Sequence, residues 1–514
     1  MIRATVAALL LLTASGLAAQ PAPEPEGPSW AEQALARLPM LRMCERPNAP
    51  EPLLCGLLTV WENTATRTGR QIELSIVVIP AATEKPPTDP VFVLEGGPGG
   101  AATKRAVSSI YSGPVRARDI VLVDQRGTGD SHQLQCDLGG AESMEPGKLP
   151  QMFPAEDVAA CAEALSANAD VFLYGSAEHA DDLEAVRVAL GYGKLNLRGG
   201  SYGTRAMMVY AQRYPDNVRT MFGIGVDSPI RSNMSERGVF AQRTLIGLGE
   251  MCRQSPECRA KAPDLFSMTS GLLASLAKKP RRVEIEDPTV AGETLSLDVG
   301  REWLAEKIRL NLYFAFTSQA YPWAVHRASM ADDWQPLVQL AIFIERMFRS
   351  AISNGVLLTV QCSESMDFDL DQARERGAAT LFGNYRLEQQ IQGCAAWPHE
   401  KRPPLGVVEP RVLPIPTLFL SGALDPVTPP EYAEEAQTLF PESHHIVLPE
   451  GQHGPFDLAN SWVCVHQVWA EFLDKGSAES LDLTCVDTMT RPPFLLDEAS
   501  FETHLREVLA PMVQ

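Results

Sequence analysis

Ser201 stands in a sequence pattern that can turn a serine hydroxyl into a nucleophile. The run Gly199-Gly200-Ser201-Tyr202-Gly203 has the form G-x-S-x-G and falls between a predicted strand at residues 195–197 and a predicted helix at residues 204–214. A serine on such a sharp strand-to-helix turn projects its hydroxyl above the sheet, and the turn requires flanking positions without a Cβ. The competing interpretation is an ordinary tight turn. The strand-turn-helix context favours a nucleophile that attacks a carbonyl carbon.

A serine hydroxyl is a weak nucleophile at neutral pH and needs a base that a third group orients. His453 lies in a glycine-flanked loop after one predicted strand, and Asp425 follows the strand before it. Both come after Ser201 in the order nucleophile, acid, histidine, and both fall beyond the carboxyl ends of strands, where α/β sheets collect catalytic groups. We expect His453 to be the base and Asp425 its partner. Asp227, which also follows a predicted strand, is a rival acid.

The glycine-rich run at residues 95–100 begins where the predicted strand at residues 91–94 ends. Glycines let backbone N–H groups approach a ligand closely, as the negative oxygen of a tetrahedral intermediate requires. A phosphate-binding loop is the alternative, but no GK[ST] follows and Pro98 removes a donor. We expect the N–H groups of Gly97 and Tyr202 to form the oxyanion hole.

The elements that position these residues are predicted from the alternation of short β-branched runs with helical periodicity, which indicates a parallel sheet with crossover helices. Strands are predicted at residues 72–79, 91–94, 119–123, 195–197, 221–226, 416–420 and 445–448.

The alternation of strand and helix breaks in the middle of the chain. Residues 40–230 are expected to form the first part of the sheet domain, residues 231–404 a mostly helical insertion, and residues 405–514 the second part with a C-terminal tail. The tail beyond Cys485 has no clear periodicity and is expected to wrap the surface.

The N-terminal sequence predicts export. Residues 1–19 combine a basic start, a short apolar core and a run of small residues, which is the order of a secretory signal peptide. The apolar stretch is shorter than the roughly 20 residues that a membrane anchor needs. Residues 20–39 are expected to be a Pro-rich tether, with no membrane span after removal of the signal. A secreted or periplasmic location follows.

Ten cysteines agree with an oxidising compartment, where an even count indicates disulfides. A metal site is the alternative, but no CxxC and no His/Cys cluster at zinc-ligand spacing is present, so we expect no metal and no cofactor. Short separations predict the pairs Cys44–Cys55, Cys136–Cys161, Cys252–Cys258, Cys362–Cys394 and Cys464–Cys485.

The formal net charge of −20 argues against a nucleic-acid partner, because a phosphate-binding surface needs clustered Lys and Arg.

Together these motifs resemble the α/β-hydrolase serine exopeptidases related to prolyl iminopeptidase and the secreted tripeptidyl aminopeptidases. The resemblance rests on GGPGG at residues 96–100, on DQRGTG at residues 124–129, on GGSYGT at residues 199–204 and on the contexts of Asp425 and His453. It implies an α/β-hydrolase fold with a mostly parallel sheet, a catalytic triad of Ser201, Asp425 and His453, a cap formed by the insertion, and a structural role for the loop that contains Arg126. Glu95 replaces the histidine usual in prolyl iminopeptidases, so the tripeptidyl branch is the closer one.

The sequence therefore predicts a secreted serine peptidase that releases short N-terminal units from peptide substrates through an acyl-enzyme. An esterase or other acyl hydrolase would use the same triad, and a non-catalytic secreted binding module is the remaining alternative. An aminopeptidase must bind a free ammonium, and an unpaired ammonium is costly to take out of water. The resemblance places such acids in the cap. Glu364 is the candidate, with Asp367 as a substitute.

Overall fold

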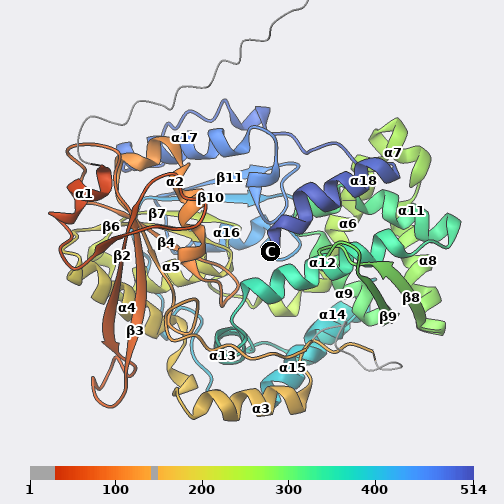
Figure 1. Cartoon of the computed structure of the whole chain (residues 1–514), viewed down its shortest axis with the longest axis horizontal. Coiled ribbons are helices and arrows are strands. Elements are labelled where there is room, and N and C mark those ends of the chain that lie inside the picture. The colour runs from red at the N-terminus through yellow and green to blue at the C-terminus, as the bar shows by residue number, and fades with distance from the viewer. Residues whose placement is uncertain (1–28, 140–148, 514) are drawn as a thin grey trace, which may run out of the picture.

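The computed structural model describes residues 29–139 and 149–513 and is built around a nine-stranded sheet (Figure 1). The predicted signal peptide, residues 1–19, and residues 20–28 of the predicted tether lie outside the described residues. The strand order is β1-β2-β3-β5-β4-β6-β7-β10-β11. The strands are β1 (Arg42–Cys44), β2 (Leu53–Trp61), β3 (Gln71–Ile79), β4 (Val91–Leu94), β5 (Ile120–Val123), β6 (Leu195–Gly200), β7 (Val218–Ile224), β10 (Thr417–Gly422) and β11 (Ser443–Leu448).

The sheet is mostly parallel, as predicted. Strands β5, β4, β6, β7, β10 and β11 pair in parallel, whereas β1, β2 and β3 form an antiparallel edge. All four residues of β4 and of β5 are buried, because helices cover both faces of a parallel sheet. The carboxyl ends of β4, β6, β7, β10 and β11 therefore meet at one edge, where the predicted catalytic residues follow the strands.

Two hydrophobic cores lie on the two faces of this sheet. Side chains of β3 alternate between them, with Ile76 and Val78 in one core and Val77 and Ile79 in the other. The first core contains residues of α1 (Trp30–Leu35), α3 (Ala155–Ser166), α4 (Ser176–Ala189), α5 (Tyr202–Arg213) and α16 (Pro430–Gln437). The second contains residues of α2 (Ala106–Ile110) and α17 (Ser461–Lys475).

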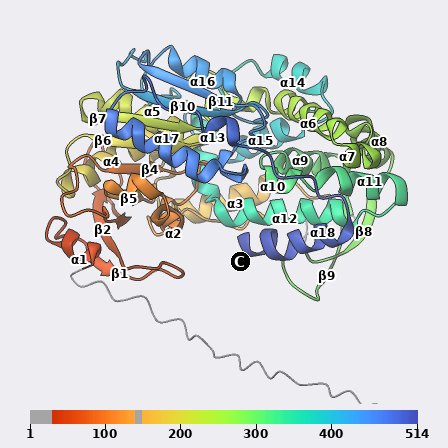
Figure 2. The ribbon, with the colours of Figure 1, turned by 90° about the horizontal axis from the view of Figure 1, so that it is seen from above.

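Between β7 and β10 the chain forms a helical layer beside the sheet (Figure 2). Its helices are α6 (Arg237–Gln254), α7 (Pro256–Lys261), α8 (Leu265–Lys278), α9 (Arg301–Asn311), α10 (Ala315–Ser318), α11 (Tyr321–Ala331), α12 (Gln335–Ala351), α13 (Asn354–Glu364), α14 (Leu370–Ala378) and α15 (Tyr385–Ala396). A hairpin of β8 (Arg281–Glu286) and β9 (Thr294–Val299) interrupts them. Most of these helices share a third core, whereas α13 and α15 contribute residues to the first core on the sheet instead.

The structure differs from the expectations at two places near the chain's ends. Residues Trp30–Leu35, inside the predicted tether, form α1, because Ser29 and Glu32 make a reciprocal capping box and Ala31 and Ala34 are buried.

The predicted surface tail contains α18 (Glu498–His504), and Phe501, Leu505 and Leu509 are buried in the core of the helical layer. The ring of Phe501 lies 5.0 Å from that of Trp323 on α11. The tail thus completes the insertion's core rather than wrapping the surface.

All five predicted disulfides are present: Cys44–Cys55, Cys136–Cys161, Cys252–Cys258, Cys362–Cys394 and Cys464–Cys485. Five disulfides are typical of proteins that fold outside the reducing cytoplasm. Among residues 29–139 and 149–513, no helix has both the length and the apolar character needed to cross a membrane.

Candidate active site

Ser201 lies on the sharp turn between β6 and α5, as the G-x-S-x-G pattern predicts. Its φ of 54° and ψ of −128° are strained for a residue with a side chain, and such strain is concentrated at functional sites. A Cβ on Gly203 would lie 2.2 Å from the carbonyl oxygen of Leu94, and one on Gly199 would lie 2.5 Å from the carbonyl oxygen of Gly203. Strand and helix therefore approach so closely that only glycine fits on either side of Ser201.

Asp425 and His453 form a buried pair on the loops that follow β10 and β11. His453 Nδ1 lies 2.8 Å from Asp425 Oδ2, and the Asp425 side chain is completely buried. Backbone N–H groups of Val427 and Thr428 donate to Asp425 Oδ1, each at 2.8 Å, and the Thr428 hydroxyl donates to Oδ2 at 2.7 Å. This network fixes the carboxylate and leaves Nε2 of His453 as the ring nitrogen that can serve a reaction.

Contacts of the neighbouring loops place the His453 ring close to the Ser201 turn. The Ser201 N–H donates to the carbonyl oxygen of Ile224 at 2.9 Å, and a Cβ on the next residue, Gly225, would lie 3.3 Å from His453 Cε1. The backbone carbonyl oxygen of Tyr313, in the insertion, accepts a hydrogen bond of 2.9 Å from the His453 backbone N–H. The hydrogen bonds of the described residues do not include one between Ser201 Oγ and His453. Catalytic hydrogen bonds are often long in unliganded enzymes and tighten when substrate binds.

Asp227, the rival acid, is engaged elsewhere. Its carboxylate forms an ion pair of 3.2 Å with Arg205 and accepts a hydrogen bond of 2.9 Å from Asn233 Nδ2. Asp425 is therefore the carboxylate that the structure brings to His453.

The glycine-rich loop after β4 packs directly against the Ser201 turn. A Cβ on Gly96 would lie 3.0 Å from the Cβ of Ser201. Gly97 has a φ of 120°, which only glycine adopts readily. Tyr202 is the first residue of α5, and the first N–H groups of a helix lack intrahelical acceptors. The two predicted oxyanion donors therefore lie on the two segments that flank Ser201.

Glu95, at the start of this loop, forms a bidentate ion pair with Arg105. Arg105 Nε donates to Glu95 Oε2 at 3.0 Å, and Nη2 donates to Oε1 at 2.9 Å. Burial opposes ionisation of the carboxyl, but Arg105 outweighs it and lowers the pKa of Glu95. The residue that departs from the prolyl iminopeptidase pattern is thus an ionised, paired carboxylate in the wall of the site.

The loop that contains Arg126 supports the site without entering it. Arg126 is fully buried and donates from Nε and Nη2 to both oxygens of Asp182, at 2.7 and 2.6 Å. The neighbouring Gln125 donates from Nε2 to the Tyr202 hydroxyl at 3.3 Å. The loop is therefore connected to the first residue of α5.

Glu364 is not placed as the amine-anchor hypothesis requires. Its side chain is buried and does not line the cavity that contains Ser201. Ser176 donates to both carboxylate oxygens, from N–H at 2.8 Å and from Oγ at 2.6 Å. Burial raises the pKa of Glu364. Ser176 Oγ also lies 2.7 Å from the Tyr202 hydroxyl, so Glu364 supports the base of α5 from outside the cavity. Asp367 is exposed and paired with Lys401.

Ser201, His453, Gly97 and Tyr202 all line one cavity of about 1420 Å³. Small-molecule sites usually enclose roughly 300–1,000 Å³, so this cavity has room for a ligand larger than a simple ester. Residues of the helical insertion form much of its wall, which places the insertion over the Ser201 turn.

Two residues at the site escaped the sequence analysis. Thr428 contacts both members of the Asp425–His453 pair, its hydroxyl lying 3.0 Å from His453 Nδ1. Its position three residues after an Asp is a recognisable turn signal. Ser176 has no comparable signal, because its partner Glu364 is 188 residues away.

The chain is similar in sequence to known families and proteins. Residues 89–240 match the alpha/beta hydrolase fold family, and residues 379–485 match the family described as TAP-like protein. A tripeptidyl aminopeptidase of Streptomyces coelicolor is 26% identical over 487 residues, covering 87% of this chain and 85% of that protein. Serine protease Hip1 of Mycobacterium bovis is 25% identical, covering 74% of this chain and 78% of that protein. A solved esterase of Thermogutta terrifontis is 16% identical, with a TM-score of 0.36 and coverage of 82% of this chain and 99% of that one.

The parallel sheet, the strained Ser201 turn and the family match over residues 89–240 define the chain as an α/β hydrolase. Residues 379–485 resemble the TAP-like family, and tripeptidyl aminopeptidases are among the distant relatives of the chain.

Proposed function

We propose that this α/β hydrolase is a serine peptidase that releases short N-terminal units from peptides outside the cytoplasm. The observation that carries the proposal is the buried Asp425–His453 pair beside the strained Ser201 turn, in the wall of one large cavity. The names of the distant relatives, tripeptidyl aminopeptidase and serine protease, support a peptide rather than a small ester as substrate.

In the proposed reaction Ser201 Oγ attacks the scissile carbonyl carbon while His453 Nε2 takes the hydroxyl proton. The negative oxygen of the tetrahedral intermediate accepts hydrogen bonds from the N–H groups of Gly97 and Tyr202. The C–N bond then breaks, and the imidazolium gives its proton to the leaving amine. A water molecule, deprotonated by His453, hydrolyses the acyl-enzyme and restores the Ser201 hydroxyl. Asp425 stays ionised and stabilises the imidazolium.

The helical insertion, residues 231–404, is proposed to act as a cap that limits access to Ser201. Residues 1–19 are proposed to direct export and to be removed, which agrees with the five disulfides. Glu364 has no part in this proposal as an amine anchor, because it is buried against Ser176 and does not line the cavity.

The test is to incubate the purified protein with free and N-acetylated peptides and with aryl esters, and to identify the products by mass spectrometry. The proposal expects short N-terminal fragments from the free peptides, and covalent labelling of Ser201 by a fluorophosphonate. Ser201→Ala should abolish both while keeping the circular dichroism spectrum, because the triad acts as a unit. Turnover of esters without any peptide cleavage would instead identify an esterase. The absence of both labelling and turnover would identify a non-catalytic protein.

A further inference from the structure

Three arginine side chains of the helical insertion meet in the wall of the cavity that contains Ser201. They are Arg237 at the start of α6, Arg309 on α9 and Arg386 on α15. The carboxylate among them is Glu306, which accepts from Arg309 Nε and Nη2, each at 2.7 Å. Arg386 Nε lies 3.9 Å from the same carboxylate. One carboxylate therefore faces three guanidinium groups.

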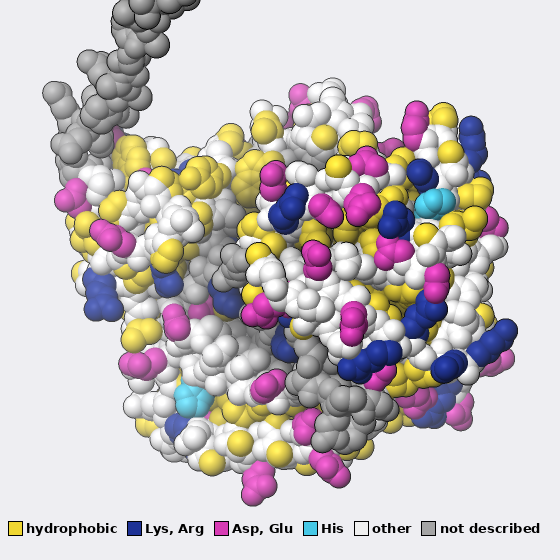
Figure 3. All heavy atoms as spheres, turned by 45° about the vertical axis from the view of Figure 1, so that its right-hand side comes forward, with side chains coloured by type: hydrophobic (Ala, Val, Ile, Leu, Met, Phe, Trp, Pro, Cys, Tyr) yellow, Lys and Arg dark blue, Asp and Glu magenta, His cyan; other side chains and the backbone are white. Residues whose placement is uncertain are grey.

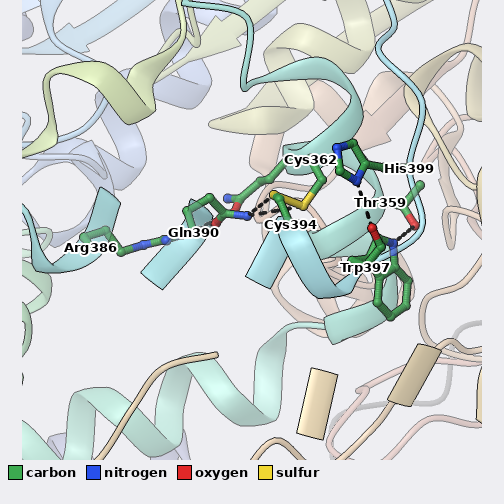
Figure 4. Close-up of a disulfide and its surroundings, with 8 residues drawn as sticks. Thr359, Cys362, Arg386, Gln390, Cys394, Trp397 and His399 are labelled. Carbon is green, nitrogen blue, oxygen red and sulfur yellow. Dashed lines mark hydrogen bonds between the residues drawn. A yellow bond between two sulfur atoms is a disulfide. The ribbon is translucent and has the colours of Figure 1, made fainter. Parts of the chain in front are cut away.

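Arg386 is positioned by neutral groups beside a disulfide (Figure 4). Its Nη1 donates to Gln390 Oε1 at 3.0 Å, and its Nη2 donates to Gln361 Oε1 at 3.2 Å. Gln390 Nε2 in turn lies 3.2 Å from Cys394 Sγ and 3.6 Å from Cys362 Sγ. The disulfide that joins α13 to α15 thus holds Gln390, one of the two amides that orient Arg386, and neither amide carries a charge that could compensate that of the guanidinium.

Arg237 is likewise oriented by an amide. Its Nε and Nη2 approach Asn233 Oδ1 at 3.3 and 2.9 Å, and Asn233 Nδ2 donates to Asp227. Within the described ranges, no carboxylate lies at ion-pair distance from Arg237. As the first residue of α6 it also faces the positive end of the helix dipole, where a cation is unfavourable. A residue that breaks a local rule in this way is expected where function requires it.

The whole cavity wall shares this excess of positive charge. Nine Lys and Arg residues but only five Asp and Glu residues line it, although the chain carries a formal charge of −20. The face of the molecule shown in Figure 3 contrasts with the cavity, because basic and acidic side chains are interspersed over it. A cleft lined by one sign of charge concentrates ligands of the opposite sign.

The ionisation of the arginines agrees with a positive charge that Glu306 compensates only in part. Burial and the neighbouring guanidinium of Arg237 lower the pKa of Arg386 to about 9. Burial also lowers the pKa of Arg237. A bound anion would offset both effects.

We propose that Arg237 and Arg386 bind a carboxylate of the peptide substrate, so that the cavity selects acidic peptides or short peptides with a free C-terminus. This inference rests on the proposed peptidase function and adds a specificity site to it. The planar forks of two guanidinium groups match a carboxylate better than any other group of an unmodified peptide.

The test uses pairs of peptides with free N-termini that differ in one group: Glu against Gln in the sequence, and a free against an amidated C-terminus. The ratio of kcat/KM within each pair measures selection for the carboxylate. Wild-type enzyme should prefer the charged member of at least one pair by about tenfold or more, as expected for hydrogen bonds to a charged group. The pair that shows the preference identifies the source of the carboxylate.

Arg237→Gln and Arg386→Gln should each reduce this ratio to below about threefold. Arg374→Gln is the matched control, because Arg374 lies on α14, pairs with the exposed Glu388 and does not line the cavity. It should keep the wild-type ratio. Arg237, which is only partly buried, provides the decisive variant if removal of Arg386 prevents folding. Absence of any preference in the wild type, or a wild-type ratio in both folded variants, would overturn the proposal.

A second measurement separates this inference from the proposed function. The same peptide pairs are tested as inhibitors of aryl ester hydrolysis, which requires the triad but no peptide cleavage. If the peptides are not cleaved and the charged members still inhibit more strongly, the peptidase proposal fails and the carboxylate site stands. Equal inhibition by the charged and neutral members would overturn the carboxylate site.

Discussion

Asp425 Oδ2 lies 2.8 Å from His453 Nδ1, and no part of the Asp425 side chain reaches solvent. Two backbone N–H groups and the Thr428 hydroxyl also donate to this carboxylate. The carboxylate is thus held in one position, and it selects the imidazole tautomer whose Nε2 can accept a proton.

Asp425→Asn should lower kcat for ester and peptide hydrolysis by on the order of 10⁴-fold, because an amide favours the wrong tautomer of His453. Steady-state kinetics on an aryl ester measure this effect. Asp227→Asn serves as the comparison, since Asp227 pairs with Arg205 and not with His453. The assignment fails if Asp227→Asn damages kcat more than Asp425→Asn does.

Gly203→Ala should destabilise the protein by about 3 kcal/mol and reduce labelling of Ser201, because the new Cβ would collide with the backbone oxygen of Leu94. Gly271→Ala is the control: it lies within α8 and its Cβ would meet nothing within 4 Å. That variant should gain up to about 1 kcal/mol from helix propensity. Urea unfolding measures both changes, and equal stabilities would contradict the tight packing of β4 against α5.

Glu364→Gln should leave the preference for free over N-acetylated peptides unchanged, because Glu364 contacts Ser176 and not the cavity. The amide can keep both hydrogen bonds if the Ser176 hydroxyl becomes an acceptor. Glu364→Ala leaves the Ser176 N–H unpaired and should cost about 1–3 kcal/mol. Loss of the free-peptide preference in Glu364→Gln alone would restore the carboxylate as an amine anchor.

Asp457 should make stability depend on pH in a defined window. Burial raises its pKa from 3.8 to about 6, and its Oδ1 has no hydrogen-bond partner in the structured part of the chain. The folded state therefore favours the protonated form. The protonated carboxyl makes its full contribution to the free energy of unfolding below about pH 4. This contribution is lost as pH rises through 6. Relative to Asp457→Asn, the wild type should lose unfolding free energy between pH 4 and 7 in urea titrations. If the unfolding free energy of the wild type relative to Asp457→Asn stayed constant or rose over this pH range, the raised pKa of Asp457 would be contradicted.

Removal of the Cys362–Cys394 disulfide by double alanine substitution should lower the free energy of unfolding by about 4 kcal/mol. The reason is that this disulfide closes a loop with a sequence separation of 32. The Cys252–Cys258 loop, with a separation of 6, should cost only about 2 kcal/mol by the same argument. Denaturant unfolding measures both. Free thiols in the denatured, unreduced protein, or a reversed order of the two costs, would contradict this prediction.

Structure is predictable from this sequence where the signal is local. The glycines around Ser201 and the β-branched runs of β4 and β5 carry their structural requirement within a few residues, and short separations predicted every disulfide. Asp425 and His453, which the structure brings together, each lie within five residues of the end of a strand.

The failures arise where distant segments decide the outcome. The sequence around Glu364 suggests a free carboxylate in the cap, whereas in the folded chain Ser176 donates to both of its oxygens. The Arg237–Arg386 cluster joins the start of α6 to α15, and no periodicity predicts that contact. The helix at Trp30–Leu35 was missed inside a Pro-rich stretch, although Ser29 and Glu32 form a capping box at the expected spacing.

The position of α18 has a consequence for the order in which the protein can fold. Phe501 covers Trp323 in the core of the helical insertion, yet residues 498–504 follow every strand of the sheet in the chain. Domains tend to fold in the order in which they emerge during synthesis. Here the ten helices of the insertion emerge after β7 but before β10, β11 and α18, so their shared core keeps apolar surface exposed until α18 has followed. A nascent chain halted before residue 498 would therefore have a folded sheet, an open helical core and a tendency to aggregate through that core.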